Sequence, residues 1–161
     1  MDEFAIPADF QKIWARVTDR EPEQQLPSTP VGELERFING EVRAIDFYQL
    51  LAARCTGRER RTLMHIITDE RRHLRLLQLE YFMRTGDSFL PPATVPAARA
   101  GVLQTIREAV LTETEAAAAY TAAGKARGGD LGTMYMSFAG DETEHAAMLR
   151  EMLGRCFTAQ G

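Results

Sequence analysis

Apolar residues recur every three to four positions along four long stretches of this 161-residue chain. This period places them on one face of an α-helix, so each stretch predicts an amphipathic helix whose apolar face is buried. Gly57 and the pair Gly128-Gly129 fall between neighbouring stretches, where glycine favours a tight turn. The pattern predicts an all-α fold, a four-helix bundle built from two hairpins. The predicted helices span about residues 31–55, 58–85, 97–125 and 130–156.

The connection between the two predicted hairpins, about residues 86–96, contains Pro91, Pro92 and Pro96, which exclude a helix there. Fully extended, this segment can span about 35–40 Å, which is about the length of a 25-residue helix. It is therefore long enough to cross the bundle from end to end. Its length is also compatible with a plain up-and-down turn.

The first 30 residues differ from the rest of the chain. Their apolar side chains have helical spacing over about residues 8–19, which predicts a short amphipathic helix. Three prolines follow and predict an extended linker. We therefore divide the chain into an N-terminal helix with a Pro-containing linker, residues 1–30, and the four-helix bundle, residues 31–161.

Composition and charge exclude several classes of protein. The net charge of −4 and the pI of about 5.4 give no electrostatic reason to expect a nucleic-acid partner. No segment approaches the roughly 18 apolar residues of a membrane span, and the acidic N-terminus does not resemble a secretory signal. Cys55 and Cys156 are far apart, so the chain has no Cys-x-x-Cys metal module. These features predict a cytoplasmic protein without a membrane partner.

Each predicted helix also carries a glutamate on its otherwise apolar face. Residues equidistant from a turn lie side by side in an antiparallel hairpin, so each hairpin places its two glutamates opposite each other. A buried carboxylate without a partner costs on the order of several kcal/mol even after relaxation. Four of them at one level therefore need compensation, which bound cations can supply. The four residues are Glu41, Glu70, Glu113 and Glu142.

These glutamates belong to a pattern that the chain carries twice. In each copy a Tyr follows the first Glu by seven residues, a second Glu follows it by 29, and a His follows the second Glu by three. Residues three apart share a helix face, so each Glu-x-x-His directs a carboxylate and an imidazole toward one point. Four carboxylates and two imidazoles form the ligand set of a carboxylate-bridged di-metal site, and they suit iron, manganese or zinc. The two copies are Glu41, Tyr48, Glu70, His73 and Glu113, Tyr120, Glu142, His145.

The neighbours of these motifs have different expected roles. Asp69 and Asp141 precede the two Glu-x-x-His motifs, and an Asp there could accept the N–H of a ligating His and determine its tautomer. Arg71 and Arg72 are expected on a solvated face together with other arginines of the same helix. His65 is off the ligand position and is expected to be an ordinary, partly exposed histidine.

Simpler explanations exist for parts of the pattern. A single Glu-x-x-His is more often a surface ion pair than a metal ligand, but the second copy with matching offsets argues against that here. Tyr48 and Tyr120 are compatible with core packing as well as with contacts to the ligands and a redox role. Glu115 competes with Glu113 for the ligand position, but it lies about 200° further around the helix. We therefore expect Glu113 to be the ligand.

At these residues the chain resembles the ferritin-like superfamily and, within it, the rubrerythrin and erythrin branch. The resemblance covers about residues 31–156. It implies a ferritin-like bundle with a crossover connection between the second and third helices, and a di-iron centre like that of rubrerythrins and bacterioferritins. In such a centre Glu70 and Glu142 would bridge the two ions. The other implied ligands would each cap one ion: Glu41, His73, Glu113 and His145.

The chain departs from these families at three points. It has no cysteine-rich rubredoxin domain, so electrons would come from an external donor. Ala116 stands where rubrerythrins carry an additional carboxylate. Arg71 stands where bacterioferritins carry a haem-binding methionine, so we expect no haem.

The resemblance thus implies an oxidoreductase in which ferrous iron reacts with peroxide or O₂. An iron-binding storage protein with a ferroxidase-type centre is one alternative. A metal-free helical interaction protein, with the N-terminal segment as its docking element, is another. We expect a homo-oligomer, at least a dimer.

Overall fold

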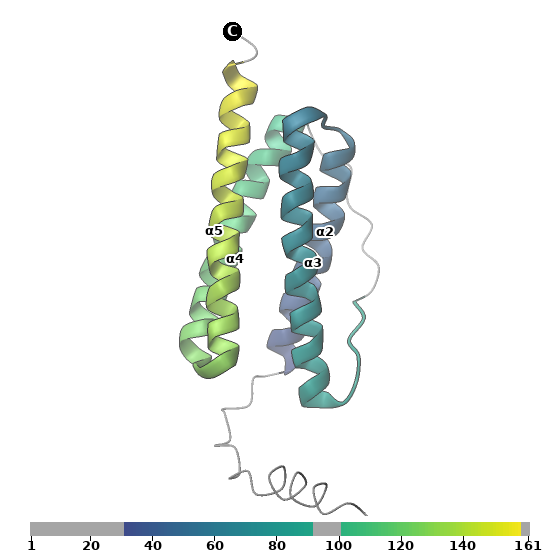
Figure 1. The fold of residues 1–161 in the computed structure, drawn as a ribbon, viewed down its shortest axis with the longest axis vertical. Helices are drawn as coiled ribbons and strands as arrows, with labels where there is room; N and C mark the ends of the chain where they lie inside the picture. Colours follow the sequence, from purple (N-terminus) through teal and green to yellow (C-terminus); the bar gives the residue numbers. More distant parts are fainter. Residues whose placement is uncertain (1–30, 92–100, 159–161) are drawn as a thin grey trace, which may run out of the picture.

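The structure of the chain, a computed structural model, describes the backbone of residues 31–91 and 101–158 and the side chains as far as residue 155. Within these ranges the fold is all-α and its four helices form a bundle, as the sequence predicted (Figure 1). The predicted N-terminal helix and linker lie outside the described residues. None of the described helices is long and apolar enough to cross a membrane. The helices are α2 (Val31–Ala53), α3 (Gly57–Thr85), α4 (Val102–Arg127) and α5 (Gly129–Thr158).

The helices pair into two hairpins, α2 with α3 and α4 with α5, and α3 also lies beside α5. In Figure 1, α2 rises from the lower end of the bundle and α3 returns to it, whereas α4 begins at the upper end and α5 returns there. α3 and α4 therefore run in the same direction. The end of α3 and the start of α4 lie at opposite ends of the bundle.

Several helix boundaries differ from the prediction, and local backbone geometry explains two of them. α2 ends at Ala53, two residues early, because the N–H groups of Arg54 and Cys55 bond to carbonyl groups three residues back and tighten the last turn. α4 begins at Val102 and not near residue 97, since Gly101 has an extended ψ of 155°.

Glycines allow the turn between α4 and α5 to be short. Gly128 and Gly129 adopt positive φ angles of 63° and 55°, which cost a residue with a Cβ atom more than glycine. The helices also approach each other closely beside this turn, since a Cβ added at Gly132 would lie 2.7 Å from the carbonyl oxygen of Gly124. α4 and α5 therefore meet backbone to backbone near their turn, which no pairing of larger residues would allow.

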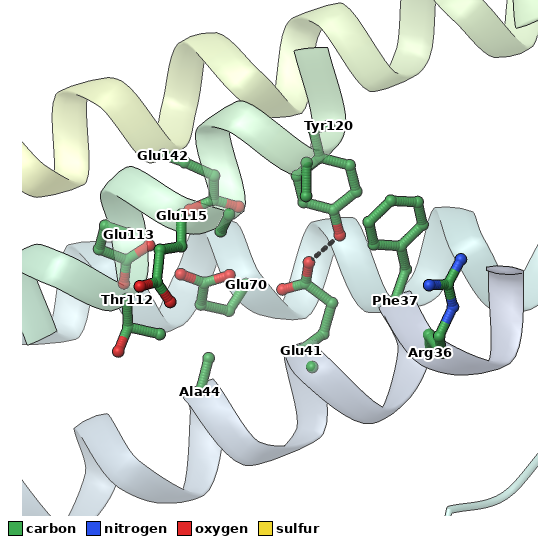
Figure 2. A pocket seen from close by; sticks show the side chains of 13 residues that line it. Arg36, Phe37, Glu41, Ala44, Glu70, Thr112, Glu113, Glu115, Tyr120 and Glu142 are labelled. Atoms are coloured by element: carbon green, nitrogen blue, oxygen red, sulfur yellow. Dashed lines mark hydrogen bonds between the residues drawn. The ribbon is translucent and has the colours of Figure 1, made fainter. Parts of the chain in front are cut away.

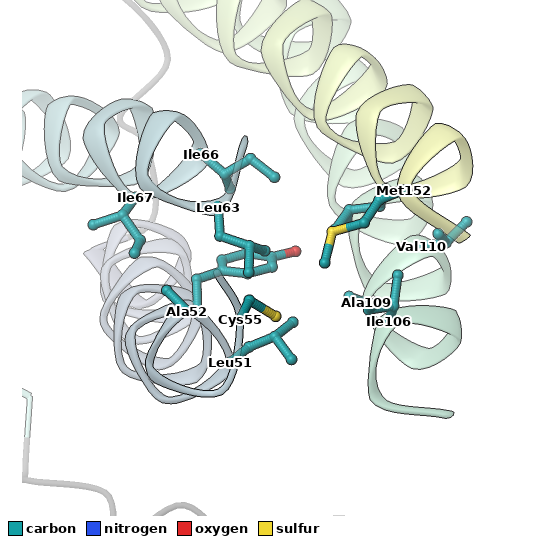
Figure 3. Packing of buried hydrophobic residues seen from close by; sticks show 12 residues of the cluster. Leu51, Ala52, Cys55, Leu63, Ile66, Ile67, Ile106, Ala109, Val110 and Met152 are labelled. Atoms are coloured by element: carbon teal, nitrogen blue, oxygen red, sulfur yellow. The ribbon is translucent and has the colours of Figure 1, made fainter. Parts of the chain in front are cut away.

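The apolar core consists of two clusters, one toward each end of the bundle. All four helices contribute to the first, as Figure 3 shows for Leu51, Ile66, Ile106 and Met152. All four helices also contribute to the second cluster, whose buried members are Leu34, Ile38, Leu77, Tyr120, Ala123, Leu131, Tyr135, Phe138 and Ala139.

A layer of buried charged residues separates the two apolar clusters. In α2, Glu41 lies between Ile38 of the second cluster and Tyr48 of the first. In α3, Glu70 and His73 occupy the same interval between the two clusters. The same order recurs in α4 and α5, so each helix contributes charge at one level of the bundle.

Candidate metal centre

The six residues that the sequence singled out as metal ligands converge in this polar layer, where each is at most 4% exposed. Their potential ligand atoms form two overlapping groups, and the atoms within each group lie within 4.8 Å of one another. Glu70 and Glu142 belong to both groups, which places their carboxylates between two potential cation positions. The first group is completed by Glu41 and His73, and the second by Glu113 and His145.

Both imidazoles turn their Nδ1 atoms toward the shared carboxylates. His145 Nδ1 lies 3.0 Å from Glu142 Oε2 and 3.2 Å from Glu70 Oε1. His73 Nδ1 lies 3.2 Å from Glu142 Oε1 and 3.6 Å from Glu70 Oε2. Each imidazole therefore contacts one shared carboxylate of its own helix and one of the facing helix.

The outer nitrogen of each imidazole contacts an aspartate from the other copy of the motif. His73 Nε2 lies 3.0 Å from Asp141 Oδ2, and His145 Nε2 lies 3.3 Å from Asp69 Oδ2. An acceptor at Nε2 holds a proton there and leaves the Nδ1 lone pair for a cation. The sequence predicted aspartate contacts to the histidines, and the structure shows that these contacts cross between α3 and α5.

The two tyrosines cross between the copies in the same way. The Tyr48 hydroxyl donates a hydrogen bond to Glu113 Oε1, and the Tyr120 hydroxyl donates one to Glu41 Oε1, which Figure 2 marks with a dashed line. The ring of Tyr48 packs in the first apolar cluster and that of Tyr120 in the second. The two roles that the sequence left open, core packing and contact with the predicted ligands, are thus combined in each tyrosine.

The carboxyl groups of the site have divergent pKa values. Burial raises the pKa of Glu41 well above its ordinary value and raises that of Glu113 to about 9, and neighbouring carboxylates add to both increases. Burial also acts to raise the pKa values of Glu70 and Glu142. Contacts with the imidazoles outweigh it there, so both of these pKa values are lowered.

The imidazoles complete the balance of charge. Burial acts to lower their pKa values, but contacts with Glu142 and Glu70 outweigh it and raise the pKa of His73 to about 9 and that of His145 to about 11. In the absence of a cation at neutral pH, two carboxyls are therefore protonated, and two carboxylates face two imidazolium groups. The site neutralises itself with protons that a cation would have to displace.

The residues fit a cation by two further observations. Glu70 Oε1 and His73 Nδ1 each have a charged neighbour at 3.2 Å but make no hydrogen bond of good geometry, although buried polar atoms of native proteins are nearly always hydrogen-bonded. Both atoms belong to residues of the first group of potential ligands. Carboxylate oxygen and imidazole nitrogen are also ligands that iron, manganese and zinc accept in proteins.

A pocket of about 310 Å³ opens onto the site between α2 and α4, and we call this side the open face. Its wall includes all four carboxylates but neither imidazole. Small residues, among them Gly40, Ala44 and Ala116, form much of the remainder. Figure 2 shows the carboxylates lying around this space, so their oxygen atoms can be reached from this side.

Other charged residues of the prediction lie outside both ligand groups. Glu115 lines the pocket but is exposed, whereas Glu113, two residues earlier, is 3% exposed and belongs to the second group. His65 is exposed, and its contact with Asp69 Oδ2 is long, at 3.8 Å. The structure therefore places both residues as the sequence predicted.

Arg72 differs from the prediction of a purely solvated arginine. Its guanidinium Nη2 donates to Asp141 Oδ2 at 2.7 Å and lies 3.5 Å from Asp69 Oδ1. The spacing of Arg72 three residues after Asp69 signalled the second of these contacts. The first depends on how α3 and α5 pack, which the sequence does not reveal.

Comparisons with known proteins support the fold and name no activity. No protein-family model matches the chain, and no curated protein does. A solved structure, that of a hypothetical protein, Pfu-1136390-001 from Pyrococcus furiosus, is similar with a TM-score of 0.69. The alignment covers 82% of this chain and 92% of that chain, at 23% sequence identity. At this identity the likeness concerns the fold alone.

Proposed function

We propose that the chain is a carboxylate-bridged di-metal protein that binds two iron ions and reacts them with peroxide or O₂. The observation that carries this proposal is the overlap of the two ligand groups, which share Glu70 and Glu142. These two carboxylates would bridge the ions. Glu41 and His73 would complete one coordination sphere, and Glu113 and His145 the other. Manganese or zinc suits the same donor atoms.

Charge supports two ions and not one. Four ionised carboxylates and two neutral imidazoles carry four negative charges, which two divalent cations balance. A single cation would leave two negative charges in a layer that is almost fully buried, at a cost of several kcal/mol per ion on the order expected for buried charge. The same balance without metal requires the four bound protons described above.

The open face supports an oxidoreductase role. Bound ferrous ions would supply two electrons, enough to reduce one molecule of hydrogen peroxide to water with two protons. The pocket wall includes the four carboxylates and several small side chains, which leave room for a small oxidant beside the site. Tyr48 and Tyr120, whose rings pack in the apolar clusters, hold the carboxylates of Glu113 and Glu41 by hydrogen bonds.

The electrons would be returned by an external donor. The whole sequence contains two cysteines and no Cys-x-x-Cys pair, so it offers no rubredoxin-type iron site. An electron-transfer protein or small reductant is therefore part of the proposal. We also propose that the chain works as a homo-oligomer.

Anaerobic loading with ferrous ion, removal of excess metal and elemental analysis test the proposal. We expect two iron ions per chain, followed by faster oxidation with peroxide or O₂ than free ferrous ion shows in the same buffer. A plateau at zero or one ion in a folded protein contradicts the di-metal site. Two stable ferrous ions that neither oxidant oxidises contradict the oxidoreductase role. Iron far above two per chain in a cage-sized assembly indicates storage.

A further inference from the structure

The side of the site formed by α3 and α5 carries a polar network, which we call the bridged face. It consists of Asp69, Arg72 and Asp141. Each aspartate contacts one imidazole through Nε2, as described above, and Arg72 contacts both aspartates through the same nitrogen, Nη2. A chain of polar contacts therefore runs from His73 to His145 through one guanidinium.

Asp141 is held most firmly in this network. Its Oδ2 atom accepts from Arg72 Nη2 at 2.7 Å and lies 3.0 Å from His73 Nε2. Asp69 lies farther from both of its partners, at 3.5 Å from Arg72 Nη2 and 3.3 Å from His145 Nε2. The guanidinium thus supports the His73 half of the site more directly than the His145 half.

The internal repeat shows that Arg72 has no counterpart in the second copy of the motif. The motif of α3 reads Asp-Glu-Arg-Arg-His and that of α5 reads Asp-Glu-Thr-Glu-His, so Glu144 takes the place of Arg72. Glu144 is exposed and cannot neutralise an aspartate. Among the residues that the structure describes, Arg72 alone of the arginines and lysines lies within ion-pair distance of Asp69 and Asp141. One side chain therefore serves both halves of an otherwise symmetric arrangement.

We propose that Arg72 is a positioning residue that orients both aspartate–histidine couples and thereby sets the affinity of both halves of the site for cations. An aspartate that accepts from Nε2 directs the Nδ1 lone pair toward the cation, and it does so only while its own rotamer is held. A planar guanidinium fixes the directions of the two N–H bonds on Nη2, which lies beside both aspartates, more closely than a flexible ammonium would. The inference rests on the proposed di-metal function.

The test compares three variants with the wild-type protein by titration with Co²⁺ alone, followed by ligand-field absorption and calorimetry. Arg72→Gln removes the charged bridge, and Arg72→Lys keeps the charge but not the planar guanidinium. Arg71→Gln is the matched control, because Arg71 is the adjacent, exposed arginine and contacts neither aspartate. Thermal melting without metal shows whether each variant folds.

We expect wild type and Arg71→Gln to bind two Co²⁺ ions with the same affinity and spectrum. In Arg72→Gln the His73 half of the site should bind Co²⁺ about 10-fold more weakly. This is the lower end of the range for mutations of residues that contact metal ligands. The other half should weaken less, so a single binding phase should separate into two, and the ligand-field bands should shift. Arg72→Lys should fall between wild type and Arg72→Gln.

The possible failures are distinguishable. If the wild-type protein binds two Co²⁺ ions and Arg72→Gln matches Arg71→Gln in affinity and spectrum, the role of Arg72 is wrong and the di-metal proposal stands. The same conclusion follows if Arg72→Gln does not fold and Arg72→Lys binds as wild type does. If the folded wild-type protein binds no Co²⁺, the proposed function fails and this inference fails with it.

Discussion

The open face and the bridged face border different parts of the same six-residue site and are built for different tasks. On the open face, between α2 and α4, the carboxylates meet a pocket whose wall includes several small side chains. On the bridged face, between α3 and α5, directed polar contacts hold the imidazoles. The difference suggests that access and ligand orientation are separated in space. Substitutions on the open face should then change the rate of oxidation, and substitutions on the bridged face should change the affinity for cations.

The largest effect should come from a residue that both ligand groups share. Glu70→Gln removes the negative charge from a carboxylate that belongs to both ligand groups, so we expect the variant to lose most of its capacity for both ions. Elemental analysis after ferrous loading measures this. Glu144→Gln, which changes an exposed glutamate of α5 in the same way, should keep two ions. Retention of both ions by Glu70→Gln would contradict the bridging role.

A one-sided loss should follow from Glu113→Ala. Glu113 belongs to the second ligand group alone, so its removal should cost about one ion per chain and most of the oxidation activity. Glu115→Ala should keep both ions and change the stability by no more than about 0.5 kcal/mol, as is usual for an exposed residue. If Glu115→Ala were the more damaging change, the assignment of Glu113 would be wrong.

Binding of cations should release protons from the site. At neutral pH the metal-free site holds protons on Glu41, Glu113, His73 and His145, so loading with two ions should release up to about four protons per chain. Affinity should therefore rise with pH until these groups titrate, the first of them near pH 9. Calorimetry in buffers of different ionisation enthalpy measures the release. A release near zero would show that the cation binds elsewhere.

The same groups predict how the stability of the metal-free protein depends on pH. The folded pKa values of His73 and His145 are raised, so their contribution is complete below the ordinary histidine pKa and is lost as pH rises through about 9 and about 11. The raised pKa of Glu113 acts in the same direction, because the native state binds the proton that the unfolded chain has lost. The melting temperature without metal should fall as pH increases from 7 to 10, and saturating metal should reduce this fall. A melting temperature that rises over this range would contradict the protonation states.

The smallest effect should arise on the open face. Ala116→Leu fills part of the pocket without touching a charge, so it should slow oxidation by peroxide or O₂ and leave two ions bound. Stopped-flow absorbance measures the rate, and elemental analysis measures the metal. Ala118→Leu, an exposed site on the same helix outside the pocket wall, is the control. Equal rates for the two variants would show that the oxidant does not enter through this face.

Local periodicity made the helices and the inward register predictable. Glu41 and Glu70 follow the apolar stripes of their helices, and the midpoint between them falls between residues 55 and 56, next to Gly57, so their level in the first hairpin could be worked out from the chain alone. The same holds for Glu113 and Glu142 about Gly128. The burial of all four confirms this register, because a residue on the wrong face of a helix would be exposed. The early end of α2 and the late start of α4 were missed, since local backbone geometry and not apolar spacing sets them.

The sequence by itself therefore determined which residues face the interior, because a helix repeats its faces every 3.6 residues, about one turn, whatever it packs against. Only the tertiary structure decided that residues of one copy of the motif contact the predicted ligands of the other copy. Tyr48 bonds to Glu113 and Asp141 contacts His73 because the two hairpins face each other across the site. Arg72 joins the network for the same reason, since α3 lies beside α5. Contacts between elements far apart in the chain depend on packing, and no local period encodes them.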